Sequence, residues 1–126
     1  MSIVNTHFGA ARISDMLSAC KKIFFIGVGG VSMSSLAQMT KMRGFSVAGS
    51  DRNKSALTER LQKNGIKVFE GHAKENVSDA DAVVYTLAIG EDNPEYVEAK
   101  RRGIPAISRA DYLGYIMTGF QRRLGI

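Results

Sequence analysis

Short apolar runs of strand length recur along the chain, and stretches with helical spacing lie between them. The first run, Ile23 to Val28, is continuously apolar and ends in glycines, which is typical of a strand buried on both faces of a parallel sheet. Four shorter runs, bounded by turn residues, predict further strands over 45–49, 66–69, 82–86 and 106–108. The pattern therefore predicts about five strands.

The stretches between the strands have the spacing of amphipathic helices. A short helix is expected over 13–19, ahead of the first strand. The stripe of the next helix ends near Gly44 and consists of Met33, Leu36, Ala37 and Thr40. Three more helices are expected over 53–65, 93–103 and 108–119, capped by Asn53, Asn93 and Ser108. This alternation predicts an α/β fold, a doubly wound, mostly parallel Rossmann-like sheet of about five strands with helices on both faces.

Length and composition limit the class of protein. With 126 residues, of which 44% are hydrophobic, the chain can bury one core and is expected to form one compact domain. Its 17 basic and 12 acidic side chains give a net charge of +5, which suits an anionic small ligand. Nucleic acid is not the expected partner, because aromatic residues are few, tryptophan is absent and basic residues are scattered among acidic ones.

Cysteine content and hydropathy indicate the compartment. Cys20 is the only cysteine, so no intrachain disulfide can form, and no paired cysteine or histidine motif indicates a metal site. No stretch approaches the roughly 18 apolar residues of a membrane span. A cytoplasmic protein without membrane contact is therefore expected.

The first strand leads into a glycine-rich turn, Gly27-Val28-Gly29-Gly30, directly before a helix. Backbone N–H groups at the start of a helix lack intrahelical acceptors and lie at the positive end of its dipole, so they can bind a phosphate. The glycines would let the phosphate approach the backbone. Ser32 adds a hydroxyl but stands where the motif G-x-G-x-x-G has its third glycine. We interpret the turn as a diphosphate site; the alternative is a tight turn without a ligand.

Asp51 follows the second predicted strand and lies about 20 residues beyond Ser32, the spacing at which an acid reaches ribose hydroxyls. The alternative is a solvent-exposed acid that caps the next helix. Together with the glycine turn, Asp51 indicates a nucleotide diphosphate, either a dinucleotide or a nucleotide sugar. An NAD-binding Rossmann domain of a dehydrogenase, or a nucleotide-sensing regulator, therefore stays open as an alternative.

Four sequence words occur in order along the chain: Phe24 to Ser34, Gly49-Ser50-Asp51, Gly71-His72 and Glu91 to Glu95. With these words the chain resembles the N-terminal domain of the Mur ligases, over 22–126. Two positions depart from the family pattern. Ser32 replaces a glycine, and Leu87 stands where the family often has a serine, so that a hydroxyl contact is lost there.

The resemblance implies a function for the whole enzyme and for this part of it. Mur ligases are ATP-dependent, amide-bond-forming enzymes of peptidoglycan synthesis. In the family this domain holds the uridine diphosphate part of a substrate such as UDP-N-acetylmuramate, a central domain binds ATP and Mg²⁺, and a third domain receives the amino acid. Carried over position by position, the resemblance implies as substrate-binding residues Gly27, Val28, Gly29, Gly30, Ser32, Met33, Ser50, Asp51, His72, Thr86, Ala88 and Ile89.

The resemblance also implies how the chain is divided. An N-terminal extension with a short helix covers 1–21, the Rossmann-like substrate-binding domain covers 22–119, and 120–126 begins a central ATP-binding domain that is missing. In the family a strand like 123–126 leads into a phosphate loop of the Gly-x-x-Gly-Lys-Thr type, which does not occur here. The chain is therefore expected to bind its substrate, to bind no cofactor and to catalyse nothing alone.

Two residues near the expected site receive a structural interpretation. Asn93 is expected to cap a helix, and Arg109 is expected to be exposed at a helix start. A non-catalytic interaction module is the remaining alternative, supported only by the basic pair Arg122-Arg123 near the end of the chain.

Overall fold

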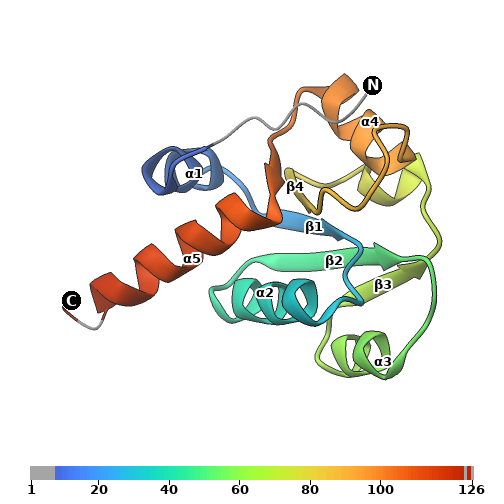
Figure 1. The fold of residues 1–126 in the computed structure, drawn as a ribbon, viewed down its shortest axis with the longest axis horizontal. Coiled ribbons are helices and arrows are strands. Elements are labelled where there is room, and N and C mark those ends of the chain that lie inside the picture. Colours follow the sequence, from blue (N-terminus) through green and yellow to red (C-terminus); the bar gives the residue numbers. More distant parts are fainter. Residues whose placement is uncertain (1–7, 124, 126) are drawn as a thin grey trace.

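The computed structural model describes residues 8–123 and 125 (Figure 1). Its centre is a sheet of five parallel strands in the order β3-β2-β1-β4-β5. The strands are β1 Lys22–Ile26, β2 Ser46–Asp51, β3 Lys67–Glu70, β4 Ala82–Tyr85 and β5 Ala106–Ser108. Strands are added first on one side of β1 and then on the other. The order therefore reverses beside β1, where a ligand crevice is expected at the carboxyl ends of the strands.

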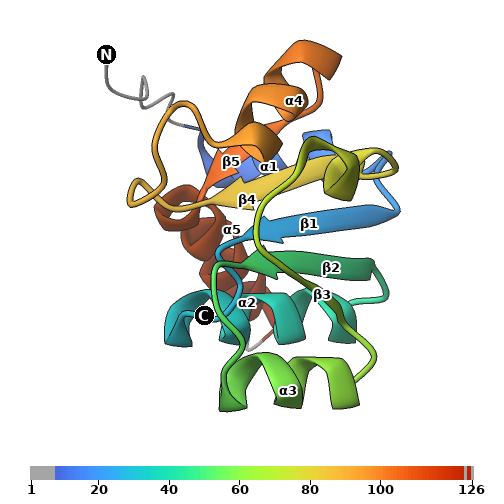
Figure 2. The ribbon, with the colours of Figure 1, turned by 90° about the vertical axis from the view of Figure 1, so that its right-hand side faces the viewer.

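Helices cover both faces of the sheet, and Figure 2 shows the five strands lying side by side between them. The helices are α1 Ala10–Leu17, α2 Val31–Met42, α3 Ala56–Lys63, η1 Lys74–Val77 (a 3-10 helix), α4 Pro94–Arg102 and α5 Arg109–Arg123. One buried cluster joins α1, α2, α3 and α5 to one face, and another joins η1 and α4 to the opposite face. The predicted doubly wound α/β fold is confirmed. Within the described residues, no helix has the length and apolar character that crossing a membrane requires.

The central strand β1 shows why its sequence is continuously apolar. Ile23 and Phe25 are fully buried in the cluster beneath α1, α2 and α5. Phe24 and Ile26 are fully buried in the cluster beneath α4. Because successive side chains of a strand point to opposite faces, a strand covered on both faces needs apolar residues at every position.

Helix caps confirm two sequence predictions and correct a third. Ser108 caps α5, because its Oγ accepts a hydrogen bond from the Asp111 amide at 3.3 Å. Asn93 caps α4, since its Oδ1 accepts hydrogen bonds from the amides of Glu95 (3.0 Å) and Tyr96 (3.2 Å). The cap of α3 is Ser55 and not Asn53. Ser55 Oγ accepts from the Thr58 amide, and Thr58 Oγ1 accepts from the Ser55 amide, which is a reciprocal capping box.

The two ends of the described chain pack against each other. Ile13 and Leu17 of α1 are fully buried in the same cluster as Tyr112 of α5, so the segment expected as an N-terminal extension contributes to the core. Helix α5 continues to Arg123, and the expected helix end near Gly119 is therefore wrong. The strand expected over 123–126 begins inside this helix, while residues 124 and 126 lie outside the described part of the chain.

Candidate functional site: a cleft at the carboxyl ends of the strands

A cleft of about 550 Å³ lies where the strand order reverses, within the size range of small-molecule sites. Nine of the twelve residues expected to bind substrate line it: Gly27, Gly30, Ser32, Met33, Asp51, His72, Thr86, Ala88 and Ile89. Six further residues complete the lining, namely Val31, Arg52, Gly90, Asp92, Asn93 and Arg109. The lining residues come from segments that are distant in the sequence and that the parallel sheet brings to one edge.

The glycine turn is fixed to the neighbouring strand β2. Gly27 has a φ of +84°, a backbone conformation that favours glycine. The amides of Gly27 and Val28 both donate to the carbonyl oxygen of Ser50, each at 2.8 Å. The turn therefore directs the start of α2 toward the end of β2.

The N-terminus of α2 offers backbone donors to the cleft. The Ser34 amide makes the first helical hydrogen bond, to the carbonyl of the N-cap residue Gly30 at 2.8 Å. The amides of Val31, Ser32 and Met33 precede that bond and have no acceptor within the helix. No side chain of the described residues caps this end, and all three residues line the cleft. These amides, at the positive end of the helix dipole, can hold an anion.

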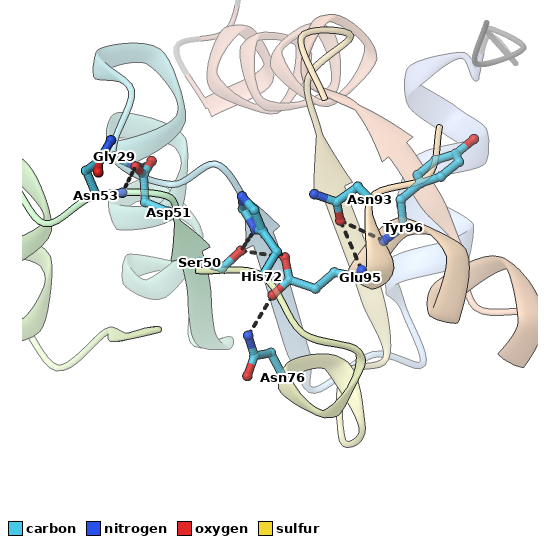
Figure 3. Close-up of polar contacts among 9 residues, drawn as sticks. All are labelled: Gly29, Ser50, Asp51, Asn53, His72, Asn76, Asn93, Glu95 and Tyr96. Atoms are coloured by element: carbon cyan, nitrogen blue, oxygen red, sulfur yellow. Dashed lines mark hydrogen bonds and ion pairs between the residues drawn. The ribbon is translucent and has the colours of Figure 1, made fainter. Parts of the chain in front are cut away.

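Gly29 binds the carboxylate of Asp51 through its backbone amide. Its amide donates to Asp51 Oδ2 at 2.8 Å, while the Asn53 amide donates to Asp51 Oδ1 at 3.1 Å (Figure 3). A Cβ atom at Gly29 would lie 2.6 Å from Asp51 Oδ2, whereas one at Gly30 would meet nothing closer than 3.9 Å. The missing Cβ of Gly29 therefore makes room for Asp51, and the expected contact of Gly29 with the diphosphate stays a prediction.

Two other expected binding residues do not line the cleft. The side chain of Val28 is fully buried in the core cluster beneath α1, α2 and α5. Ser50 is also fully buried, at the end of β2, and its hydroxyl contacts side chains of the protein.

A polar network of Ser50, His72, Asn76 and Glu95 lies beside the cleft and reaches it through His72 (Figure 3). Glu95 Oε1 lies 2.8 Å from His72 Nδ1 and accepts a hydrogen bond from Ser50 Oγ at 2.6 Å. Ser50 Oγ also lies 2.9 Å from His72 Nδ1, and Asn76 Nδ2 donates to Glu95 Oε2 at 2.8 Å. The Glu95 side chain is fully buried, whereas the His72 side chain is 21% exposed and reaches the cleft.

Ser50, His72 and Glu95 are the residue types of a hydrolase triad, but their contacts differ from those of a triad. In a triad the histidine bonds the acid with one ring nitrogen and the serine with the other. Here Nδ1 of His72 faces both partners, and the buried Ser50 hydroxyl donates directly to Glu95. The network can position a ring, but it does not present a nucleophile.

The sequence interpretation missed the role of Glu95, which it named only as the end of the word Glu91 to Glu95. Glu95 is in the first turn of α4, directly after Pro94. Its carboxylate points away from solvent toward β2 and the segment after β3, where Ser50 and His72 lie. No local pattern reveals this contact, because its partners lie 45 and 23 residues away.

Arg109 was expected to be an exposed residue at a helix start, and the structure corrects this. The side chain is only partly exposed, it lines the cleft, and its Nη1 donates to Ser32 Oγ at 3.2 Å. Arg109 therefore brings positive charge from the start of α5 to the start of α2, where an anion would lie. Among the described residues, no group of three or more His, Cys, Asp or Glu side chains is arranged to hold a metal ion.

Comparisons with known proteins identify the family of this chain. Residues 22–121 match the family model described as "Mur ligase family, catalytic domain". The UDP-N-acetylmuramate–L-alanine ligase of Clostridium botulinum is 51% identical over 84% of this chain and 23% of its own length. The enzyme of that name from Acetivibrio thermocellus is 53% identical over 77% of this chain and 21% of its own length.

A solved structure shows the same relationship. The UDP-N-acetylmuramate–alanine ligase of Thermotoga maritima is 37% identical, with a TM-score of 0.72 over 80% of this chain and 23% of that one. The chain thus spans about a quarter of the length of these relatives. The family match over most of the chain, together with these identities, shows that the chain belongs to the Mur ligase family.

Proposed function

We propose that this chain is the substrate-binding domain of a UDP-N-acetylmuramate–L-alanine ligase, an enzyme of peptidoglycan synthesis. Its cleft would hold the uridine diphosphate end of UDP-N-acetylmuramate. The names of the similar enzymes support the choice of substrate. The observation that carries the proposal is the N-terminus of α2, where three consecutive backbone amides without helical acceptors open onto a cleft of about 550 Å³.

The cleft offers a partner for each polar part of such a ligand. The diphosphate binds at the amides of Val31, Ser32 and Met33, and Arg109 adds a positive charge beside them. Asp51 uses one lone pair of each carboxylate oxygen for a backbone amide, so each oxygen can still accept a ribose hydroxyl. The segment after β4, including Thr86 and Ile89, contacts the remainder of the nucleotide sugar.

Ligation itself requires groups that this chain does not supply. In the proposed enzyme ATP and Mg²⁺ act in another domain, where metal and lysine charges stabilise developing negative charge. The sequence contains no Gly-x-x-Gly-Lys-Thr loop. We therefore propose that the chain binds the nucleotide sugar and does not catalyse alone. The cytoplasmic location expected from the single cysteine stays a prediction.

Titration calorimetry of the chain with UDP, UDP-N-acetylmuramate, uridine and NAD tests the proposal. UDP and UDP-N-acetylmuramate should bind, and uridine should bind at least about tenfold more weakly than UDP because it lacks the phosphates that accept the charged hydrogen bonds. NAD carries a diphosphate too, so it tests the choice of nucleotide. Tighter binding of NAD than of UDP would contradict the proposal and support the dehydrogenase alternative.

A further inference from the structure

We propose that Glu95, which does not line the cleft, is a positioning residue for His72. It holds the imidazole so that Nδ1 carries a hydrogen and points into the protein, while Nε2 is the atom presented to the ligand. The inference deepens the proposed function and rests on it for the identity of the ligand. The geometry of the Ser50, His72, Asn76 and Glu95 side chains carries it (Figure 3).

The hydrogen bonds of Glu95 identify it as an acceptor on both oxygens. Asn76 donates to Oε2 at 2.8 Å, and Ser50 donates to Oε1 at 2.6 Å. An ionised carboxylate accepts hydrogen bonds and donates none, so the third contact, His72 Nδ1 to Oε1 at 2.8 Å, requires hydrogen on the nitrogen. The first turn of α4 adds the positive end of a helix dipole beside the buried carboxylate.

The hydrogen count at Ser50 agrees with this assignment, given that Glu95 is the acceptor of the serine hydrogen. A serine hydroxyl has one hydrogen, and that of Ser50 is used in its bond to Glu95. At the 2.9 Å contact with His72, the serine oxygen must therefore accept, and Nδ1 must donate. Both contacts of the ring share the single hydrogen at Nδ1, in a three-centre arrangement, and this fixes the tautomer of the neutral imidazole.

The consequence for the cleft concerns the other ring nitrogen. Within the described residues, every hydrogen bond of the His72 ring is made by Nδ1, and the partly exposed ring lines the cleft. With Nδ1 held, Nε2 is the ring atom left for the ligand: its lone pair can accept a ligand hydroxyl, and a hydrogen on it can be donated to a phosphate oxygen. The other charged residues that line the same cleft are Asp51, Arg52, Asp92 and Arg109.

The tautomer can be measured without any ligand. Long-range ¹H–¹⁵N correlation spectra should show the neutral ring of His72 with hydrogen on Nδ1, and the chain has only two histidines, so a His72→Ala spectrum assigns the signal. In Glu95→Gln the share of the Nε2–H tautomer should rise. The control is Glu98→Gln, on the same helix, whose carboxylate binds Arg101 and should leave the tautomer unchanged.

A variant of Ser50 keeps the test decisive if Glu95→Gln does not fold. Ser50→Ala removes the serine contact and leaves the contact between Glu95 and His72, so the Nδ1–H tautomer should persist. An Nε2–H tautomer in the unmodified chain, its appearance in Ser50→Ala, or an unchanged tautomer in Glu95→Gln would each overturn the assignment to Glu95.

Binding of UDP then tests whether Glu95 acts through His72. His72→Ala should weaken UDP binding about tenfold, and Glu95→Gln should weaken it about threefold. In the His72→Ala background, Glu95→Gln should cause no further loss, because the ring that it positions is gone. Additive effects of the two substitutions would contradict a positioning role. If the unmodified chain does not bind UDP, the proposed function fails, whereas the tautomer spectra still decide the role of Glu95.

Discussion

The two sides of the cleft are built in different ways. On the side of the glycine turn, the expected anion site consists of backbone amides of three consecutive residues, Val31 to Met33, which one turn and one helix place together. On the side of His72, the side chains of Ser50, His72 and Glu95 come from separate segments and meet only because the chain folds. A backbone site is therefore visible as a local sequence pattern, while a side-chain network is a product of tertiary structure.

The difference also determines how each side can be disturbed. No substitution other than one by proline removes a backbone N–H, so the glycine side is disturbed by blocking it, by moving the turn or by introducing proline. The histidine side depends on particular side-chain atoms, and one changed atom, as in Glu95→Gln, alters its hydrogen bonds.

Blocking the backbone amides should have the largest effect on binding. In Gly30→Val the backbone can stay as it is, since φ is −70° and ψ is 150°, but the new side chain lies at the mouth of the α2 N-terminus. UDP affinity should fall about 100-fold, because two charge-assisted hydrogen bonds or more are lost. Calorimetry measures the affinity, and urea unfolding should show a cost of about 1 kcal/mol or less.

Gly9→Val is the matched control for that variant. Gly9 is the N-cap of α1, with nearly the same backbone angles and open space around its Cα, and it does not line the cleft. Gly9→Val should lower the free energy of unfolding by a similar amount and leave UDP binding unchanged. Equal affinities of the Gly30 and Gly9 variants would show that the start of α2 is not the anion site.

Asp51→Asn should reduce stability more than binding. The carboxylate ties the glycine turn to the end of β2 by accepting the amides of Gly29 and Asn53, and an asparagine can accept only one of them. The free energy of unfolding should fall by about 1–2 kcal/mol, and UDP affinity by a few fold. An unchanged urea midpoint would mean that Asp51 does not hold the turn.

Asp81 offers the same chemistry at the opposite edge of the sheet. It accepts the amides of Lys21 and Lys22, at 2.8 and 2.9 Å, and these bonds hold its pKa below the ordinary value of 3.8. A lowered pKa in the folded state stabilises the fold at pH values above the ordinary pKa, and that contribution disappears as the pH falls through the lowered value. Asp81→Asn should cost about 1 kcal/mol at neutral pH without affecting UDP binding.

The pH dependence checks the sign of this effect. Urea unfolding of the unmodified chain and of Asp81→Asn should give free energies of unfolding that converge as the pH falls below 3.8. A difference that persists or grows in acid would show that the Asp81 carboxylate does not stabilise the fold through its charge.

The smallest change is expected at Ser32. Ser32→Gly restores the family's residue and removes the acceptor of Arg109 Nη1. Because the guanidinium can then donate fully to the ligand, UDP affinity should rise by about threefold or less. Titrations at low and high salt should show a steeper salt dependence for the variant. A tenfold loss would instead show that the Ser32 hydroxyl itself binds the ligand.

The parts of the fold that depend on local pattern could be predicted from the sequence. Apolar runs indicated the five strands, most clearly β4, whose four residues are all apolar and buried because both faces are covered. Asn93 could be recognised as a cap, since its role depends on the next three residues. The cap of α3 was misplaced because Asn53 and Ser55 are both good caps, and only Ser55 meets a reciprocal partner in Thr58.

The sequence predictions fail where contacts between distant parts of the chain determine the structure. Gly119 was expected to end a helix, but Tyr112 and Ile116 are buried against the sheet, and their packing helps α5 continue through a residue of low helix propensity. Glu95 and Arg109 find partners 45 and 77 residues away. Gly29 fits a phosphate motif, yet its amide donates to Asp51 and its lack of a Cβ leaves space for the Asp51 side chain. No local spacing reveals this contact.

The most direct test of the central claim is a ¹H–¹⁵N amide spectrum of the chain recorded during titration with UDP and, separately, with uridine. The amide signals of Val31, Ser32 and Met33 should move strongly with UDP and remain nearly unchanged with uridine, because only the phosphates accept their hydrogen bonds. If UDP binds while these three signals stay in place, or if uridine moves them equally, the α2 N-terminus is not the diphosphate site.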